Sequence, residues 1–261
     1  MRKWMPFLAA FYMIFHLGPD TFAQGVGPPR SPCGPIFPSD ASLEWDCYRV
    51  KKGETPETLF GEYWEAVLRF NRIDRRHVWP GKYLKTPRDL NAALNFNPMP
   101  QALERAASNK KYILIDLAGQ FLGAYEWGKL QFALPIASGR GYSTPKGIFR
   151  VLARDRYHRS SLYTIQGTSI PYPMYWGIHF YTSKKGVRFW IHSRDIPGYP
   201  ASHGCIGLYD EEMQRQFYGS PQDPKLNDAK RLYLWLFPDG ESDEKPIAYP
   251  KDAPVIPIEI I

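Results

Sequence analysis

The sequence has little of what membrane, nucleic-acid-binding and metal-binding proteins need. Apart from one apolar run near its start, it has no stretch of the roughly 20 apolar residues that span a bilayer as a helix. Its formal net charge is +7, but the basic residues are scattered and no nucleic-acid-binding motif accompanies them. Neither Cys-x-x-Cys nor His-x-x-x-His spacing is present. We therefore expect no nucleic-acid partner and no metal, and nothing in the sequence calls for a cofactor.

The one apolar run lies between Trp4 and Leu17, follows two basic residues, and leads to a small residue at Ala23. This order is typical of a secretory signal peptide. The alternative is a retained membrane anchor, for which a run of about 14 apolar residues is short. We expect residues 1–23 to be removed, leaving no membrane span, and the protein to be exported to the periplasm or cell wall. The basic surplus suits an envelope rich in carboxylate and phosphate, and a merely solvated basic surface explains it equally well.

Cysteine is rare, with three residues in the chain, and the odd number leaves at least one of them unpaired within a monomer. Cys33 and Cys47 lie 14 residues apart. If they are oxidised together, the loop they close contributes about 3 kcal/mol of stability, but the sequence does not decide whether they pair. That pairing would leave Cys205 free. A free thiol is a liability in an oxidising compartment unless it has a function.

Proline content and apolar periodicity divide the rest of the chain into five parts. We interpret them as a Pro-rich linker at 24–44, a strand-helix-strand module at 45–88, a helical connector at 89–109, a catalytic domain at 110–238 and a tail at 239–261. The sequence pattern of the tail does not predict where it lies in the fold.

The part from 110 to 238 is expected to be mostly β. Its strand candidates cover 112–115, 120–125, 130–137, 148–152 and 187–191. One short helix is expected after Asp210, which would serve as its N-cap, and a closing strand is expected at 231–237.

Residues 45–88 resemble a lysin-motif domain, a small βααβ module that binds N-acetylglucosamine-containing glycans. The matching features are Tyr48-x-Val50-x-x-Gly53-Glu54-Thr55, Asn71-x-Ile73 and Pro80-Gly81-x-x-Leu84. Pro56 and a crowd of arginines near residue 75 depart from the usual run. The alternative is an unrelated small helix-turn-strand unit. The resemblance implies a glycan-binding module that is separable from the catalytic domain.

Two histidines lie within 13 residues of Cys205. A thiol attacks a carbonyl as the thiolate, so it needs a base or a positive neighbour. His192 ends a strand candidate, where a side chain is held rigidly, and His203 stands two residues before the cysteine. Gly204 lets the backbone come close to a substrate and helps N–H groups to face an oxyanion. Each residue alone has an ordinary structural explanation, but together they indicate a cysteine nucleophile with a histidine base.

The stretch from Ile191 to Ile206 resembles the signature of the YkuD-type L,D-transpeptidase catalytic domain. That signature is a histidine after a strand, a variable loop, and then Ser/Thr-His-Gly-Cys. Upstream segments also match the usual course of the family, among them Ala137-Ser138-Gly139, Thr144-Pro145 and Ile170-Pro171-Tyr172-Pro173-Met174. The resemblance implies a mostly β fold with a short helix, a thioester acyl-enzyme, and peptidoglycan stem peptides as substrates, with no cofactor.

The resemblance also implies roles for individual residues. Cys205 would be the nucleophile, and His192 the general base and later the acid. Ser193 would orient the imidazole through its backbone carbonyl. His203 and Gly204 would shape the nucleophile loop, with the N–H groups of Gly204 and Cys205 as oxyanion donors.

Substrate binding is less defined. The candidates are Tyr175 and Met174, after the Pro-Tyr-Pro segment, and Arg188 and Arg194. The family usually has Arg or Asn two residues after the cysteine, where this chain has Gly207, and one of the two arginines could replace it. If water were the acceptor in such a site, the enzyme would be a hydrolase: an L,D-carboxypeptidase or an endopeptidase. A wall-binding protein with an inactive catalytic domain is the alternative from another class.

Overall fold

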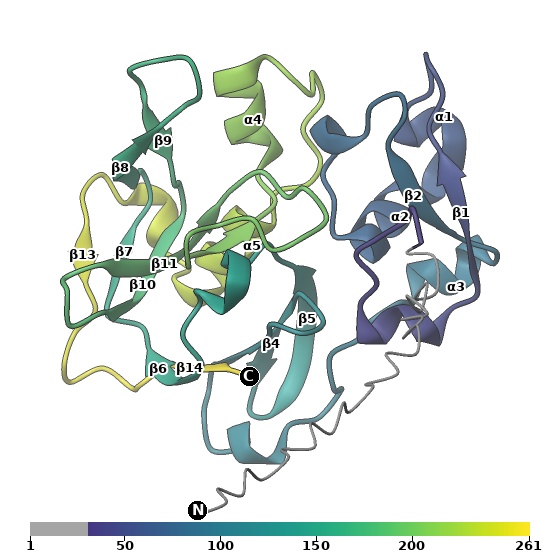
Figure 1. Cartoon of the computed structure of the whole chain (residues 1–261). Helices are drawn as coiled ribbons and strands as arrows, with labels where there is room; N and C mark the ends of the chain where they lie inside the picture. The colour runs from purple at the N-terminus through teal and green to yellow at the C-terminus, as the bar shows by residue number, and fades with distance from the viewer. Residues whose placement is uncertain (1–30) are drawn as a thin grey trace, which may run out of the picture. The chain divides into compact units, whose positions relative to one another are not determined.

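The computed structural model describes residues 31–261, and two five-stranded sheets organise most of them (Figure 1). The signal peptide expected at residues 1–23 lies outside this range. In the described part of the chain, no helix is both long enough and apolar enough to cross a bilayer. The prediction of a mostly β fold with few helices is confirmed.

The first sheet has the strand order β5-β4-β3-β14-β6. Its strands are β3 (Tyr112–Asp116), β4 (Phe121–Glu126), β5 (Lys129–Pro135), β6 (Gly147–Arg150) and β14 (Pro257–Ile260). β14 lies between β3 and β6, parallel to the former and antiparallel to the latter. The residues that we expected to be a tail therefore end in a strand inside this sheet, drawn in yellow beside the C-terminus in Figure 1.

The second sheet has the order β12-β11-β10-β7-β13. Its strands are β7 (Ala153–Asp155), β10 (Gly177–Thr182), β11 (Arg188–Ser193), β12 (Ile206–Leu208) and β13 (Ile247–Ala248). β10 and β11 form an antiparallel hairpin, whereas β11 and β12 are parallel. Parallel neighbours cannot be joined by a tight turn, so the chain between them crosses over in a longer connection. We call this connection, residues 194–205, the crossover loop.

Two helices follow the crossover loop. α4 (Glu211–Tyr218) begins as predicted after Asp210, whose carboxylate accepts a hydrogen bond from the Met213 N–H at 2.9 Å. α5 (Asp228–Leu236) occupies the place of the predicted closing strand, so that prediction is wrong. The run Leu-Tyr-Leu-Trp-Leu-Phe does not alternate in burial. The buried apolar positions of α5 fall instead at helical spacing: Ala229, Leu232, Tyr233 and Leu236.

One apolar cluster joins the two sheets and α5. Its fully buried side chains include Ile113 and Leu122 from the first sheet, and Ile191 and Ile206 from the second. Each such side chain contributes about 1.5–3 kcal/mol when it leaves water. Ile191 and Ile206 are also Cα partners in the β11–β12 ladder. The core therefore fixes the register between β11 and β12, the two strands that flank the crossover loop.

Residues 45–87 have the order strand, helix, helix, strand. β1 (Trp45–Arg49) pairs antiparallel with β2 (Tyr83–Pro87), and α1 (Pro56–Phe60) and α2 (Trp64–Asn71) lie between them in the chain. A 3₁₀ turn begins at Gly61, where a φ of 55° ends α1. The remaining elements are short: 3₁₀ turns at Pro38–Ser42, Gly61–Tyr63, Arg75–His77, Glu104–Ala106, Arg140–Tyr142 and Gly240–Ser242, helix α3 (Leu90–Leu94), and the paired strands β8 (Arg159–Thr164) and β9 (Pro171–Pro173).

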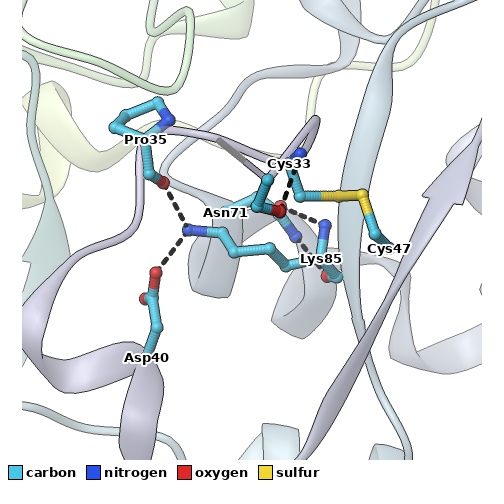
Figure 2. Close-up of a disulfide and its surroundings, with 7 residues drawn as sticks. Cys33, Pro35, Asp40, Cys47, Asn71 and Lys85 are labelled. Carbon is cyan, nitrogen blue, oxygen red and sulfur yellow. Dashed lines mark hydrogen bonds and ion pairs between the residues drawn. A yellow bond between two sulfur atoms is a disulfide. The ribbon is translucent and has the colours of Figure 1, made fainter. Parts of the chain in front are cut away.

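The described end of the expected linker is anchored to this unit. Cys33 forms a disulfide with Cys47 of β1, the pairing that the sequence left open (Figure 2). Asp40 is fully buried and accepts hydrogen bonds from Arg72 and from Lys85, each at 2.6 Å. Burial lowers the pKa of Lys85 to about 8. Removing Asp40 would leave the two buried cations without compensation, so the cluster ties the segment down.

Candidate active site

A cavity of about 800 Å³ is lined by the crossover loop, by β11 and by the β8–β9 hairpin. This volume lies within the range of about 300–1,000 Å³ that is usual for ligand sites. Both Cys205 and His192 line the cavity. The other predicted site residues in its wall are Met174, Arg188, Arg194 and His203.

His192 is held in one orientation at the end of β11. It is the ladder partner of Gly207, in the strand that begins directly after Cys205. Its Nδ1 atom lies 2.6 Å from the Ser193 carbonyl oxygen. A carbonyl only accepts, so Nδ1 carries the proton and Nε2 keeps its lone pair. Burial lowers the pKa of His192 to about 3, against the raising effect of this hydrogen bond. The imidazole is therefore neutral at neutral pH, as a general base must be.

Cys205 is partly exposed, and it is the one free cysteine among the described residues. Burial raises the pKa of its thiol, while the Trp190 backbone and the charge of Arg194 lower it. The resting thiol is therefore protonated at neutral pH, and its nucleophilicity depends on a base that takes the proton. No group of three or more His, Cys, Asp or Glu side chains within 31–261 is arranged to hold a metal ion.

Two hydroxyl groups fix the backbone around the cysteine. Ser202 Oγ donates to the Cys205 carbonyl at 2.6 Å and accepts from the Gly204 N–H at 2.9 Å. Thr144 Oγ1 donates to the Gly204 carbonyl at 2.9 Å and accepts from the Gly139 N–H at 2.8 Å. Sequence reasoning gave neither hydroxyl a role. The signal was available, because both residues belong to the segments that carry the family resemblance.

Gly204 is required by its surroundings. Its φ is 141°, and a Cβ atom there would lie 2.5 Å from the Phe189 ring. Its N–H donates to Ser202, which removes it from the oxyanion role that the sequence analysis gave it. The N–H of Cys205 donates no hydrogen bond to any described residue. Of the two expected oxyanion donors, only Cys205 keeps an N–H for that task.

The Arg194 side chain occupies the space over Gly207. A Cβ atom on residue 207 would lie 2.5 Å from the Arg194 Cδ and 2.7 Å from its Cβ. The Arg194 Nη2 donates to the Ala201 carbonyl at 3.1 Å, and its Nε is buried without a hydrogen-bond partner among residues 31–261. Of the two arginines considered as replacements for a residue 207 side chain, Arg194 is the one that fills this space. Arg188 lines the cavity from the start of β11.

Tyr175 is not part of the cavity wall, where Met174 and Tyr172 stand instead. Its carbonyl accepts from the Ser193 N–H at 2.9 Å, and its hydroxyl accepts from Arg159 at 3.2 Å. It therefore supports the end of β11, and the prediction that it lines the substrate groove finds no support in its placement.

His203 lies at the exposed side of the cavity, where its ring meets the β8–β9 hairpin. It stacks on Tyr163 of β8 with 4.5 Å between ring centroids and 9° between ring planes. Its Nε2 atom is 3.4 Å from the Arg140 Nη2. These contacts place His203 where it shapes the cavity wall, consistent with the expected shaping of the nucleophile loop.

The crossover loop rests on the segment that follows α2. The fully buried Asp74 accepts hydrogen bonds from the Ile196 N–H at 2.7 Å and from Gln214 at 2.8 Å. Asp195 accepts from Arg76 at 2.9 Å. Burial and the charge of Asp74 raise the pKa of Asp195. No sequence pattern pointed to this contact, because its partners are more than a hundred residues apart.

Comparison with known proteins gives one family match. The model of the YkuD family, the L,D-transpeptidase catalytic domain, matches residues 110–239. No curated protein matches the chain.

Solved L,D-transpeptidases are similar at low identity. One from Xylanimonas cellulosilytica shares 20% identity, with 90% of this chain and 100% of that chain covered and a TM-score of 0.43. One from Stackebrandtia nassauensis shares 19%, covering 66% and 65%, with a TM-score of 0.40. L,D-transpeptidase 1 of Mycobacterium tuberculosis shares 15%, covering 57% and 60%, with a TM-score of 0.34. The chain thus spans less than two thirds of the latter two, and the assignment depends on the family model. Residues 110–239 of the chain are a YkuD-type L,D-transpeptidase catalytic domain.

Proposed function

We propose that the protein is a peptidoglycan L,D-transpeptidase that works through a thioester on Cys205. The substrate amide joins meso-diaminopimelate to the terminal D-alanine of a stem tetrapeptide. As the sulfur attacks the amide carbonyl, His192 Nε2 takes the thiol proton and the Cys205 N–H donates to the developing oxyanion. The C–N bond then breaks, His192 returns the proton to the leaving D-alanine amine, and the stem remains on sulfur as a thioester.

The second half reverses the proton path. An amine of another stem, or of a protein, attacks the thioester carbonyl while His192 accepts its proton. The C–S bond breaks, the proton returns to sulfur, and a new amide links the two partners. Because the free thiol and the neutral imidazole are restored, the cycle needs no further reactant.

The observation that carries this proposal is the shared cavity of Cys205 and His192, with the His192 Nδ1 proton held by Ser193. The neutral imidazole is the form that can accept a thiol proton, and burial keeps it neutral. The thiol and its backbone are in turn fixed by Ser202 and Thr144. A wall-binding protein with an inactive domain has no need of such a set.

Hydrolysis of the same thioester is the second candidate, and Gly207 is the residue that favours it. With no side chain there, the site lacks the group that the family usually has two residues after the cysteine. Arg194 stands in that space, however, and supplies a guanidinium to the cavity. We therefore favour transfer to an amine.

Product analysis tests the proposal. The full chain is incubated with stem tetrapeptides and an amine acceptor. The masses of the products and of the protein are then measured by mass spectrometry. Dimers or amine adducts, with an acylated Cys205, are expected. Trimmed monomers alone would mean hydrolysis. The Cys205→Ala variant should lose at least about 10³-fold in rate while keeping its thermal stability, and turnover persisting in it would contradict the mechanism.

We further propose that residues 45–88 bind wall glycan as a lysin-motif-like module. The antiparallel pair β1–β2, with α1 and α2 between them in the chain, supports this. Two exposed aromatic residues of this module, Trp79 and Tyr83, offer apolar faces for sugar rings. Sedimentation with purified sacculi tests it: Trp79→Ala should weaken binding, and Trp127→Ala, an equally exposed tryptophan outside the module, should not.

Export to the periplasm or cell wall is proposed together with this activity. The disulfide between Cys33 and Cys47 supports it, because such bonds persist in oxidising compartments. Fractionation of cells that express the full chain tests it. Cytoplasmic protein of full mass would contradict the proposal.

A further inference from the structure

The cavity beside Cys205 has a one-sided charge. Four cationic side chains line it: Arg159, Lys185, Arg188 and Arg194. Among the residues that the structure describes, no aspartate or glutamate lines it. A concave wall with one sign of charge raises the local concentration of ligands with the opposite sign.

These four cations also lack carboxylate partners within the described part of the chain. None of them forms an ion pair there, whereas other arginines of the fold do: Arg69 with Asp228, Arg75 with Glu211, and Arg105 with Glu259. Within residues 31–261, Arg159 donates to the Tyr175 hydroxyl and Arg194 to the Ala201 carbonyl, and both of these acceptors are neutral. The positive charges of these four side chains are therefore available to bind a ligand.

Carboxylates that touch the cavity wall are already engaged. Asp155 lies 2.9 Å from the Nδ1 atom of His158. Asp195, next to Arg194 in the chain, accepts from Arg76 at 2.9 Å. Neither of them neutralises the four cations.

The structure assigns to this cavity a donor peptide with several free carboxylates, and it predicts discrimination against amidated stems. This inference rests on the proposed function and specifies its substrate. A stem tetrapeptide offers the α-carboxylate of D-glutamate, the second carboxylate of diaminopimelate and the carboxylate of D-alanine. Amidation of the first two replaces two negative charges with neutral carboxamides.

Arg194 lies over Gly207, the ladder partner of His192, and its charge acts on both reacting residues. It lowers the pKa of the Cys205 thiol and also that of His192. The first effect helps the attack, but the second opposes transfer of the proton to the imidazole. A substrate carboxylate on the Arg194 guanidinium would offset both effects while the substrate is bound. A peptide without that carboxylate loses both the contact and the compensation.

Binding to a variant that does not react tests the inference. In the Cys205→Ala protein, the affinity for a synthetic stem tetrapeptide is measured by calorimetry and compared with that for the same peptide carrying carboxamides on D-glutamate and diaminopimelate. A charge-assisted hydrogen bond is worth about 10-fold or more in affinity, so the amidated peptide should bind at least about 10-fold more weakly. The preference should shrink as salt is added.

Matched variants locate the effect. Lys185 and its neighbour Lys184 lie in the same exposed turn, but only Lys185 lines the cavity. Lys185→Ala or Arg188→Ala, in the Cys205→Ala background, should reduce the preference for the free-carboxylate peptide, and Lys184→Ala should leave it unchanged. All three changes are at exposed residues and are expected to fold.

Equal affinity for the two peptides, or no binding of either, would overturn the inference. So would equal effects of Lys184→Ala and Lys185→Ala. The proposed function is judged separately, by acylation of the wild-type thiol. A retained preference without acylation would overturn that function alone, and acylation without a preference would overturn only this inference.

Discussion

Arg194 and Gly207 fill one space between them: the aliphatic part of the arginine lies where a side chain on the glycine would stand. A Cβ atom at residue 207 would come within 2.5 Å of the Arg194 Cδ and 2.7 Å of its Cβ. The second distance involves an atom next to the backbone, which cannot swing away. The two positions are therefore coupled, although Arg194 begins the crossover loop and Gly207 lies in β12, 13 residues further along the chain.

This coupling predicts the outcome of a double-mutant cycle. Gly207→Ala should lower the free energy of unfolding by about 1–3 kcal/mol, because it overpacks a buried site. In an Arg194→Gly background the same change should cost clearly less, because the colliding Cβ, Cγ and Cδ atoms are all gone. Urea unfolding of the four proteins measures both costs. Additive losses would show that the two side-chain positions are independent.

The resting charge state of the site predicts how Cys205 reacts with iodoacetamide as pH changes. Burial raises the thiol pKa, so the alkylation rate should keep rising through the pH range near 8.5 where ordinary thiols ionise. Because the pKa of His192 is lowered to about 3, no inflection near 6.5 is expected. Without reductant, the Cys33–Cys47 disulfide keeps other thiols out of the measurement. A rate that is flat from pH 4 to 8 would instead indicate a preformed thiolate–imidazolium pair.

The sequence predicted the part of the fold that depends on local pattern. Strands β3, β4 and β11 follow alternating or apolar runs, and the helix after Asp210 follows a cap signal. The sequence did not predict the elements whose structure depends on pairing between distant parts of the chain. β14 is a strand because it inserts between β6 and β3, about 110 and 145 residues away in the chain, and a local sequence pattern does not specify partners at that distance.

The candidate site divides in the same way. His192, Cys205 and the Ser193 carbonyl were predictable, because a short motif places them close together in the chain. Arg194 over Gly207 was foreseen only as one of two options, since direction along a loop cannot be read from spacing. The support from Asp74 was not predictable, because it depends on how residues 45–88 pack against the crossover loop.

That packing predicts that the module is not merely a separable tether. Asp74→Ala should leave the Ile196 N–H and the Gln214 amide unpaired in the interior and lower the free energy of unfolding by about 2–4 kcal/mol. It should also reduce turnover of soluble stem peptides, because the loop that ends in Cys205 loses its anchor. Asp89→Ala is the matched control: it removes the cap of α3, should cost about 1 kcal/mol, and should leave turnover unchanged. Unchanged turnover in both variants would show that the crossover loop keeps its form without this contact.

The disulfide between Cys33 and Cys47 predicts a loss of stability without a loss of chemistry. It closes a loop over 14 residues, so Cys33→Ser with Cys47→Ser should lower the free energy of unfolding by about 3 kcal/mol. Asp40 lies within that loop and pairs with the buried Arg72 and Lys85. Part of the loss in stability should therefore come from weaker ion pairs of Asp40 once the loop is no longer closed. At a temperature where the variant is still folded, the rate on soluble stem peptides should equal that of the wild type, because Cys205 takes no part in the bond. Denaturant unfolding and rate measurements on the same samples check both halves. A fall in rate in the fully folded variant would mean that the tethered segment also shapes the cavity around Cys205.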